Sequence, residues 1–144
     1  MRPALIALTV ALLAPLALTA AAPKVTLDPR TALYELRTYY PAPGKLAALN
    51  TRFREHTLGI FKRHGMTNVA YWNELPSADY PEGRVVYVLA YSDRAARDAD
   101  WKAFGADPEW QKVAAASEVN GKIVAKVDSV FMTMTDYSPP LRLK

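Results

Sequence analysis

The two histidines of the chain, His56 and His64, have the widest chemical range of its side chains. A histidine that faces a pocket can donate a hydrogen bond to a ligand, act as a general base, or ligate haem iron. Both belong to one amphipathic segment, where a separation of eight residues corresponds to about 12 Å along a helix. That is too far for two ligands of one metal ion, and no acidic residue completes an HExxH-like motif. We therefore predict no metal site.

Aromatic and basic side chains near this segment supply the other candidates for a pocket. Tyr71 and Trp72 follow the histidines, and each combines a large apolar body with one polar hydrogen. Arg37 could attract an anionic ligand, or form an ion pair with Glu35 or Glu74 instead.

We predict that His56 is the polar anchor of a ligand site and, if the protein is an enzyme, its catalytic base. Arg37, Tyr71, Trp72 and His64 are predicted to complete the site. The structural alternative stays open for both histidines, since a helical histidine often bonds a backbone carbonyl, and His64 could simply end the helix.

Composition excludes several classes of chemistry. The chain has no cysteine, so it contains no thiol nucleophile, disulfide or cysteine–metal site. No glycine-rich phosphate loop, Ser-His-Asp order or paired-carboxylate motif stands out. The net charge of +4 is distributed among acidic residues rather than concentrated in a stripe, which argues against nucleic acid as a partner.

Residues 1–22 have the features of a signal peptide. A positively charged start precedes an apolar run over residues 4–18, and small residues then offer a cleavage site. The alternative is a membrane anchor, but the run is shorter than a membrane span and contains Pro15. We therefore expect a periplasmic or secreted protein with no stable membrane insertion after the signal is removed.

The mature chain alternates between strand and helix patterns. Residues 23–32 are expected to form an extended arm, and residues 138–144 a flexible tail. Strands are predicted at 33–40, 66–75, 84–91 and 122–137, and in the second of them Val69 and Tyr71 are expected on one face. Helices are predicted at 45–64, at 94–104 after the cap Asp93, and from Pro108 to about Asn120 after the cap Asp107.

This order predicts an α+β fold of the ferredoxin-like, split βαβ type over residues 33–137. Its four-stranded antiparallel sheet carries helices on one face. The other face also bears large apolar residues that one domain of this size cannot cover. We therefore predict a homodimer that packs sheet against sheet.

Several strings in this domain resemble the NIPSNAP family: YELRTYY, FREHTLGIFKRHGM, VAYW, VVYVLAYSDRAARDADWKAF and DPEWQ. The resemblance covers about residues 33 to 137. It implies a dimeric α+β barrel, a superfamily that includes cofactor-independent monooxygenases, haem-degrading enzymes, isomerases, lyases and proteins without known activity. Animal members are mitochondrial, whereas the export signal here suggests an exported bacterial branch.

Together these observations predict an exported homodimer that binds a small apolar or aromatic ligand between the first helix and the sheet, without a cofactor. Three alternatives stay open. One is haem binding through a histidine, the second is a cofactor-independent monooxygenase or isomerase, and the third is a non-enzymatic module that docks a partner protein. Whether the protein is an enzyme is left undecided, because a fold alone does not determine function.

Overall fold

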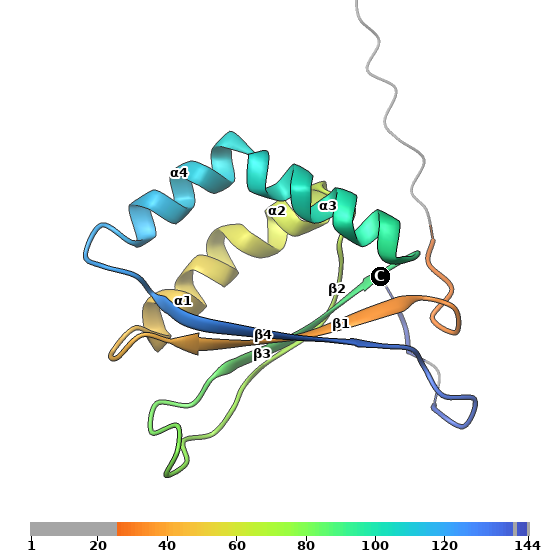
Figure 1. Cartoon of the computed structure of the whole chain (residues 1–144), viewed down its shortest axis with the longest axis horizontal. Helices are drawn as coiled ribbons and strands as arrows, with labels where there is room; N and C mark the ends of the chain where they lie inside the picture. The colour runs from red at the N-terminus through yellow and green to blue at the C-terminus, as the bar shows by residue number, and fades with distance from the viewer. Residues whose placement is uncertain (1–25, 140, 144) are drawn as a thin grey trace, which may run out of the picture.

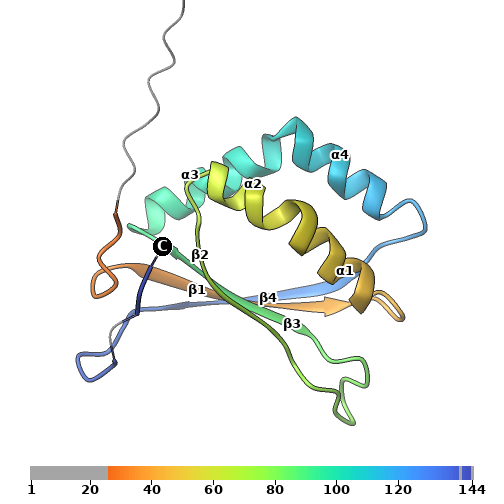
Figure 2. The same ribbon diagram turned by 180° about the vertical axis from the view of Figure 1, so that it is seen from behind.

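The computed structural model describes residues 26–139 and 141–143, so the expected signal peptide lies outside the described residues. The elements, in chain order, are β1 (Leu33–Pro41), α1 (Leu46–Arg52), the π-helical turn η1 (Phe53–Thr57), α2 (Leu58–Arg63), β2 (Thr67–Asn73), β3 (Val85–Tyr91), α3 (Arg94–Ala106), α4 (Pro108–Ser117) and β4 (Val124–Met132). The strands form one sheet in the order β2-β3-β1-β4, and every neighbouring pair is antiparallel. All helices lie on one face of this sheet (Figures 1 and 2). The predicted ferredoxin-like α+β fold is confirmed.

Strand alternation determines which side chains meet the helices. In β1, Glu35 pairs with Leu89 of β3 and Arg37 pairs with Tyr87, on the side of the sheet that the helices cover. Leu36 and its neighbours at every second position point to the other side. This is the alternation expected from the sequence, since successive side chains of a strand point to opposite faces.

The space between the first helix and the sheet is filled by aromatic side chains. The Phe53 ring lies 5.1 Å from the Tyr87 ring and 5.8 Å from the Tyr71 ring, measured between centroids. Tyr39 and Phe61 pack against it from either side. Aromatic pairs in such tilted and edge-on geometries stabilise the core beyond the area that they bury.

The prediction that Val69 and Tyr71 share one face of β2 is wrong. The β2–β3 register shifts between Asn68 and Ala70, and this irregularity interrupts the alternation of β2. As a result, Val69 packs beside Tyr34 on the uncovered side of the sheet, whereas Tyr71 faces the helices. The last strand also ends at Met132, earlier than expected.

The helix ends follow the predicted caps. The side chain of Asp93 accepts a hydrogen bond from the backbone of Ala96, and that of Asp107 accepts two from the backbone at the start of α4. Gly65 ends the first helical segment with φ +86°, a conformation that favours glycine. None of the helices in residues 26–139 is long and apolar enough to cross a membrane.

The face of the sheet that the helices leave uncovered is apolar and only partly protected. At one end, Leu27 of the N-terminal arm and Met134 and Leu143 of the C-terminal tail pack against it. On the two edge strands, Trp72 of β2 is 53% exposed and Val130 of β4 is 55% exposed.

Candidate functional site

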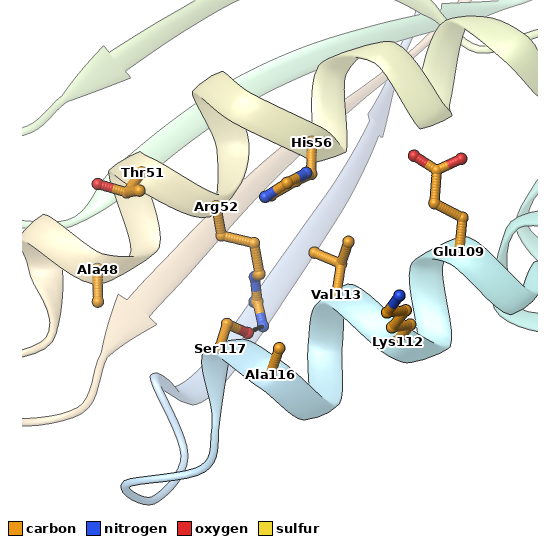
Figure 3. A pocket seen from close by; sticks show the side chains of 9 residues that line it. All are labelled: Ala48, Thr51, Arg52, His56, Glu109, Lys112, Val113, Ala116 and Ser117. Carbon is orange, nitrogen blue, oxygen red and sulfur yellow. Dashed lines mark hydrogen bonds between the residues drawn. The ribbon is translucent and has the colours of Figure 1, made fainter.

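A groove of about 600 Å³ lies between the first helical segment and α4. Small side chains leave space between the two helices along this groove: Ala48 on one side, and Val113 and Ala116 on the other. Polar groups are set among them (Figure 3). A concave site with apolar walls and a few polar groups is the usual form of a small-molecule site.

Arg52 crosses the groove from α1 to α4 (Figure 3). It is only 6% exposed, and its Nη1 donates to Ser117 Oγ at 3.2 Å and to Glu118 Oε1 at 3.3 Å. Its guanidinium carbon lies 5.2 Å from the centre of the Trp110 ring. The buried Nε has no hydrogen-bond partner within the described chain. A buried donor without an acceptor is rare in folded proteins, which makes Arg52 the most unusual residue of the groove.

The π-helical turn η1 positions the groove side of the first helix. We expected one continuous helix over residues 45–64, but the turn interrupts the α-helical pattern, and the backbone N–H of Leu58 donates to Phe53 O, five residues earlier. Thr57 Oγ1 donates to Arg52 O at 3.1 Å. Such turns are rare and occur often at functional sites. Here the turn carries His56 into the groove beside Arg52.

The two histidines have different surroundings. His56 is exposed at the groove, and its ring has no hydrogen-bond partner among residues 26–139. His64 ends α2, and its Nε2 lies 2.6 Å from Asp107 Oδ2, so the ring joins the end of α2 to the start of α4. Arg63 donates to the same carboxylate, and its hydrogen bond is the main cause that holds the pKa of Asp107 well below its usual range.

The remaining predicted site residues lie elsewhere. Tyr71 is stacked on Tyr87 in the core, and its hydroxyl donates to Asn68 Oδ1. Trp72 points to the uncovered face of the sheet. Arg37 lies on the helix side and donates to Glu35 at 2.6 Å, so the predicted ion pair is formed. Of the five predicted residues, His56 is the one that lines the groove, and the structure does not bring them into one pocket.

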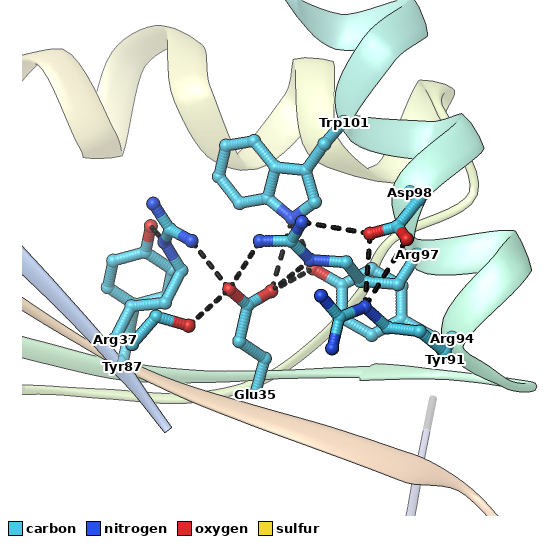
Figure 4. A network of polar contacts seen from close by, with 9 residues as sticks. Glu35, Arg37, Tyr87, Tyr91, Arg94, Arg97, Asp98 and Trp101 are labelled. Carbon is cyan, nitrogen blue, oxygen red and sulfur yellow. Dashed lines mark hydrogen bonds and ion pairs between the residues drawn. The ribbon is translucent and has the colours of Figure 1, made fainter. Parts of the chain in front are cut away.

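A second polar cluster surrounds Glu35, which is completely buried between β1 and α3 (Figure 4). Its carboxylate accepts hydrogen bonds from five residues: Arg37, Tyr91, Arg97, Trp101 and Ser129. Burial alone would raise the pKa of Glu35. The hydrogen bonds from Arg97 and Ser129 and the positive charge of Arg37 outweigh it, and lower the pKa to about 2. Glu35 is therefore a carboxylate at neutral pH.

Comparison with known proteins identifies the family. The model of the NIPSNAP family matches residues 34–139, most of the chain. The protein belongs to the NIPSNAP family. No curated protein matches the sequence.

Crystal structures of bacterial NIPSNAP proteins have the same fold. An uncharacterised NIPSNAP domain protein from Burkholderia xenovorans is 26% identical, with a TM-score of 0.62 over 74% of this chain and 98% of that one. A NIPSNAP-like domain protein from the same organism is 19% identical, with a TM-score of 0.66 over 79% and 94% of the two chains. A family member of unknown function from Agrobacterium tumefaciens is 22% identical, with a TM-score of 0.64 over 78% and 96%.

Sequence reasoning missed two features of this NIPSNAP domain. Arg52 is absent from the predicted site residues, because nothing in the local sequence pattern indicates a π-helical turn. The Glu35 cluster was reduced to its pair with Arg37, although a glutamate on the covered side of a strand, and Arg97 and Trp101 one turn apart, were available signals.

The described residues were also compared with the requirements of a metal site. In residues 26–139 and 141–143, no three His, Asp or Glu side chains gather in a way that could hold a metal ion. The haem and enzyme alternatives stay predictions.

Proposed function

We propose that this NIPSNAP protein is an exported homodimer that binds a small molecule in the groove between α1–η1 and α4. The observation that carries the proposal is the groove itself, with a buried, incompletely paired Arg52 in its wall. A folded protein normally satisfies such a donor, so one that stays unsatisfied beside a cavity suggests a missing acceptor. The proposed site lies between two helices, whereas the sequence suggested the space between helix and sheet, which aromatic rings fill.

The contacts of the groove favour binding over catalysis. A covalent or acid–base mechanism needs a nucleophile or proton donor held beside a base. The Ser117 hydroxyl instead donates to Ala114 O at 2.9 Å, and Glu109 pairs with Arg63 at 2.9 Å. Neither is hydrogen-bonded to His56 in the described structure. We therefore assign His56 to ligand contact.

The uncovered face of the sheet supports the homodimer. Register places Ala70, Val88, Leu36 and Val130 in one apolar row across the four strands. Trp72 and Val86 extend this apolar surface into the next row on β2 and β3, where Thr38 and Asp128 occupy the same row on β1 and β4. Burying such a surface against a second copy would remove it from water. Sedimentation velocity should give a dimer, and Trp72→Asp should shift it to monomer. A wild-type protein that sediments as a monomer at micromolar concentration would reject the dimer.

Export is tested separately from binding. Cell fractionation followed by mass spectrometry of the intact protein should find the chain outside the cytoplasm, with its N-terminus near residue 23. A cytoplasmic protein that retains residues 1–22 would exclude this part of the proposal.

Ligand binding is tested by filling the groove. Ala116 lines it, whereas Ala115 is an exposed neighbour on the same helix that does not. We expect native mass spectrometry and small-molecule analysis of protein purified from its own host to detect a bound compound. Ala116→Phe should remove this compound, and Ala115→Phe should retain it. Equal retention by both folded variants, or protein that carries no compound and binds none in an NMR fragment screen, would reject the groove.

A further inference from the structure

We propose that the ligand of this groove is a small carboxylic acid with an apolar body, and that the Nε–Nη2 edge of Arg52 binds its carboxylate. This inference rests on the proposed function, because it names the ligand class of the same groove. It follows from three features of the site: the pairing of the guanidinium, the balance of charge around it, and the character of the walls.

The pairing of Arg52 leaves one edge of the guanidinium without a hydrogen-bond partner in the described chain. Within the described chain, the two hydrogen bonds that Arg52 donates both start at Nη1. Nε is buried and without a partner there. Nε and Nη2 lie on the opposite edge of the planar group from Nη1. That edge can donate two parallel hydrogen bonds to one carboxylate, which is the strongest common mode of recognition of this anion by arginine.

The guanidinium is held in place before any ligand arrives. Ser117 and Glu118 fix Nη1 from α4, and the Trp110 ring lies against the guanidinium. On the other helix, the π-helical turn fixes the backbone, because Thr57 bonds the Arg52 carbonyl. A rigid binding group loses little conformational entropy when the ligand binds, which increases affinity.

The charges around the groove favour a ligand with one negative charge. Lys112 adds a second cation to the lining, and the lining carboxylate Glu109 is paired with Arg63, which does not line the groove. Glu118 offsets part of the Arg52 charge at 3.3 Å. The remaining excess is positive but small, which suits a carboxylate better than a cation, and better than a phosphate that carries two charges.

The apolar walls of the groove indicate that the ligand has an apolar body as well as a carboxylate. Ala48, Val113 and Ala116 present small apolar side chains beside the guanidinium. A volume of about 600 Å³ falls within the range of sites for small organic molecules. An alkyl or aromatic body on the carboxylate would cover these walls and displace water from them.

Matched probes test the ligand class. Octanoate carries the proposed carboxylate and body, octanamide keeps the shape without the charge, octylammonium reverses the charge, and acetate keeps the carboxylate alone. Titrations should be followed by ¹H–¹⁵N NMR of the backbone and of the Arg52 Nε–H group. We expect octanoate to shift the Arg52 Nε–H signal and the groove amides, and the other three probes to bind at least tenfold more weakly.

Two pairs of variants locate the contact. Arg52→Lys keeps the charge but loses the planar edge of the guanidinium, and should weaken octanoate binding at least tenfold. Arg54→Lys, at an exposed position of η1, is the control and should leave octanoate binding unchanged. Ala116→Phe should block octanoate without touching the guanidinium, and Ala115→Phe should not. Circular dichroism and thermal melting confirm that each variant is folded.

The outcomes separate the ligand class from the proposed function. Octanamide or acetate that binds as tightly as octanoate would overturn the inference and leave a groove that binds other ligands. Two results together would overturn the role of Arg52 as the carboxylate-binding residue: octanoate binding that survives Arg52→Lys, and an Arg52 Nε–H signal that octanoate does not move in the wild type. A groove that binds no small molecule in the host-purification and fragment experiments would reject the proposed function itself.

Discussion

Glu35 and Arg52 are the two charged side chains that the described structure buries most completely, and their surroundings differ. Glu35 accepts hydrogen bonds from five residues on four elements, β1, β3, α3 and β4. Arg52 pairs through one nitrogen with two residues, and its Nε is left over. Figures 4 and 3 show the two sites. The Glu35 carboxylate is fully hydrogen-bonded within the fold, whereas Arg52 keeps one buried donor without a partner in the described chain.

The contrast separates a structural charge from the charge that we propose to bind a ligand. Burying an ion is costly, and the cost is offset only when its hydrogen-bonding groups are satisfied. The Glu35 cluster meets this condition and links the sheet to α3. Arg52 does not meet it and lies in the wall of a groove. A protein that keeps such a group gives up some stability, which is typical of sites that bind ligands.

The largest expected effect is the loss of the Glu35 charge. Glu35→Gln retains the shape of the side chain but removes the counter-charge of Arg37 and leaves Arg97 paired with Asp98 alone. We expect the free energy of unfolding, measured with urea, to fall by about 3–5 kcal/mol, as for other buried ion pairs that lose one partner. Glu55→Gln, an exposed glutamate on η1, is the control and should change it by less than about 0.5 kcal/mol. Equal effects of the two would show that the cluster is not structural.

Acid provides a second test of the same cluster. The pKa of Glu35 is lowered from 4.5 to about 2 in the folded protein. A carboxyl group with a depressed pKa stabilises the fold above its ordinary pKa, and this contribution disappears as the pH falls from about 4.5 to about 2. Its size is at most about 3 kcal/mol. Urea unfolding between pH 5 and pH 2 should show a larger loss for the wild type than for Glu35→Gln, because Asp107, whose pKa is also depressed, contributes equally to both proteins.

Ser129→Ala checks the cause of the depressed pKa. The Ser129 hydroxyl donates to Glu35 Oε1 at 2.6 Å and lowers the pKa of the carboxyl group. Without this bond the pKa of Glu35 should rise toward its ordinary value, so the loss of stability in acid should be smaller and should be complete at a higher pH than in the wild type. An unchanged pH profile would mean that Ser129 does not tune the carboxylate.

The same two residues show what sequence patterns can and cannot provide. Alternation predicted the strand that carries Glu35, and helix caps predicted α3 and α4, so the fold could be predicted from local rules. The cluster could not, because its members come from positions 35, 91, 97, 101 and 129, which only the three-dimensional fold brings together. The groove depends on the π-helical turn and on small residues of two separate helices, and neither has a local signature.

The smallest expected effect on stability is that of Arg52→Met. The substitution removes two hydrogen bonds and a ring contact, but it also removes the buried Nε that has no partner, and Met can occupy the space of the apolar stem. We therefore expect the free energy of unfolding, without ligand, to change by no more than about 1 kcal/mol, with Arg54→Met as the exposed control. Octanoate binding should nevertheless be lost. A destabilisation as large as that of Glu35→Gln would contradict the comparison, because Arg52 would then be as structural as Glu35.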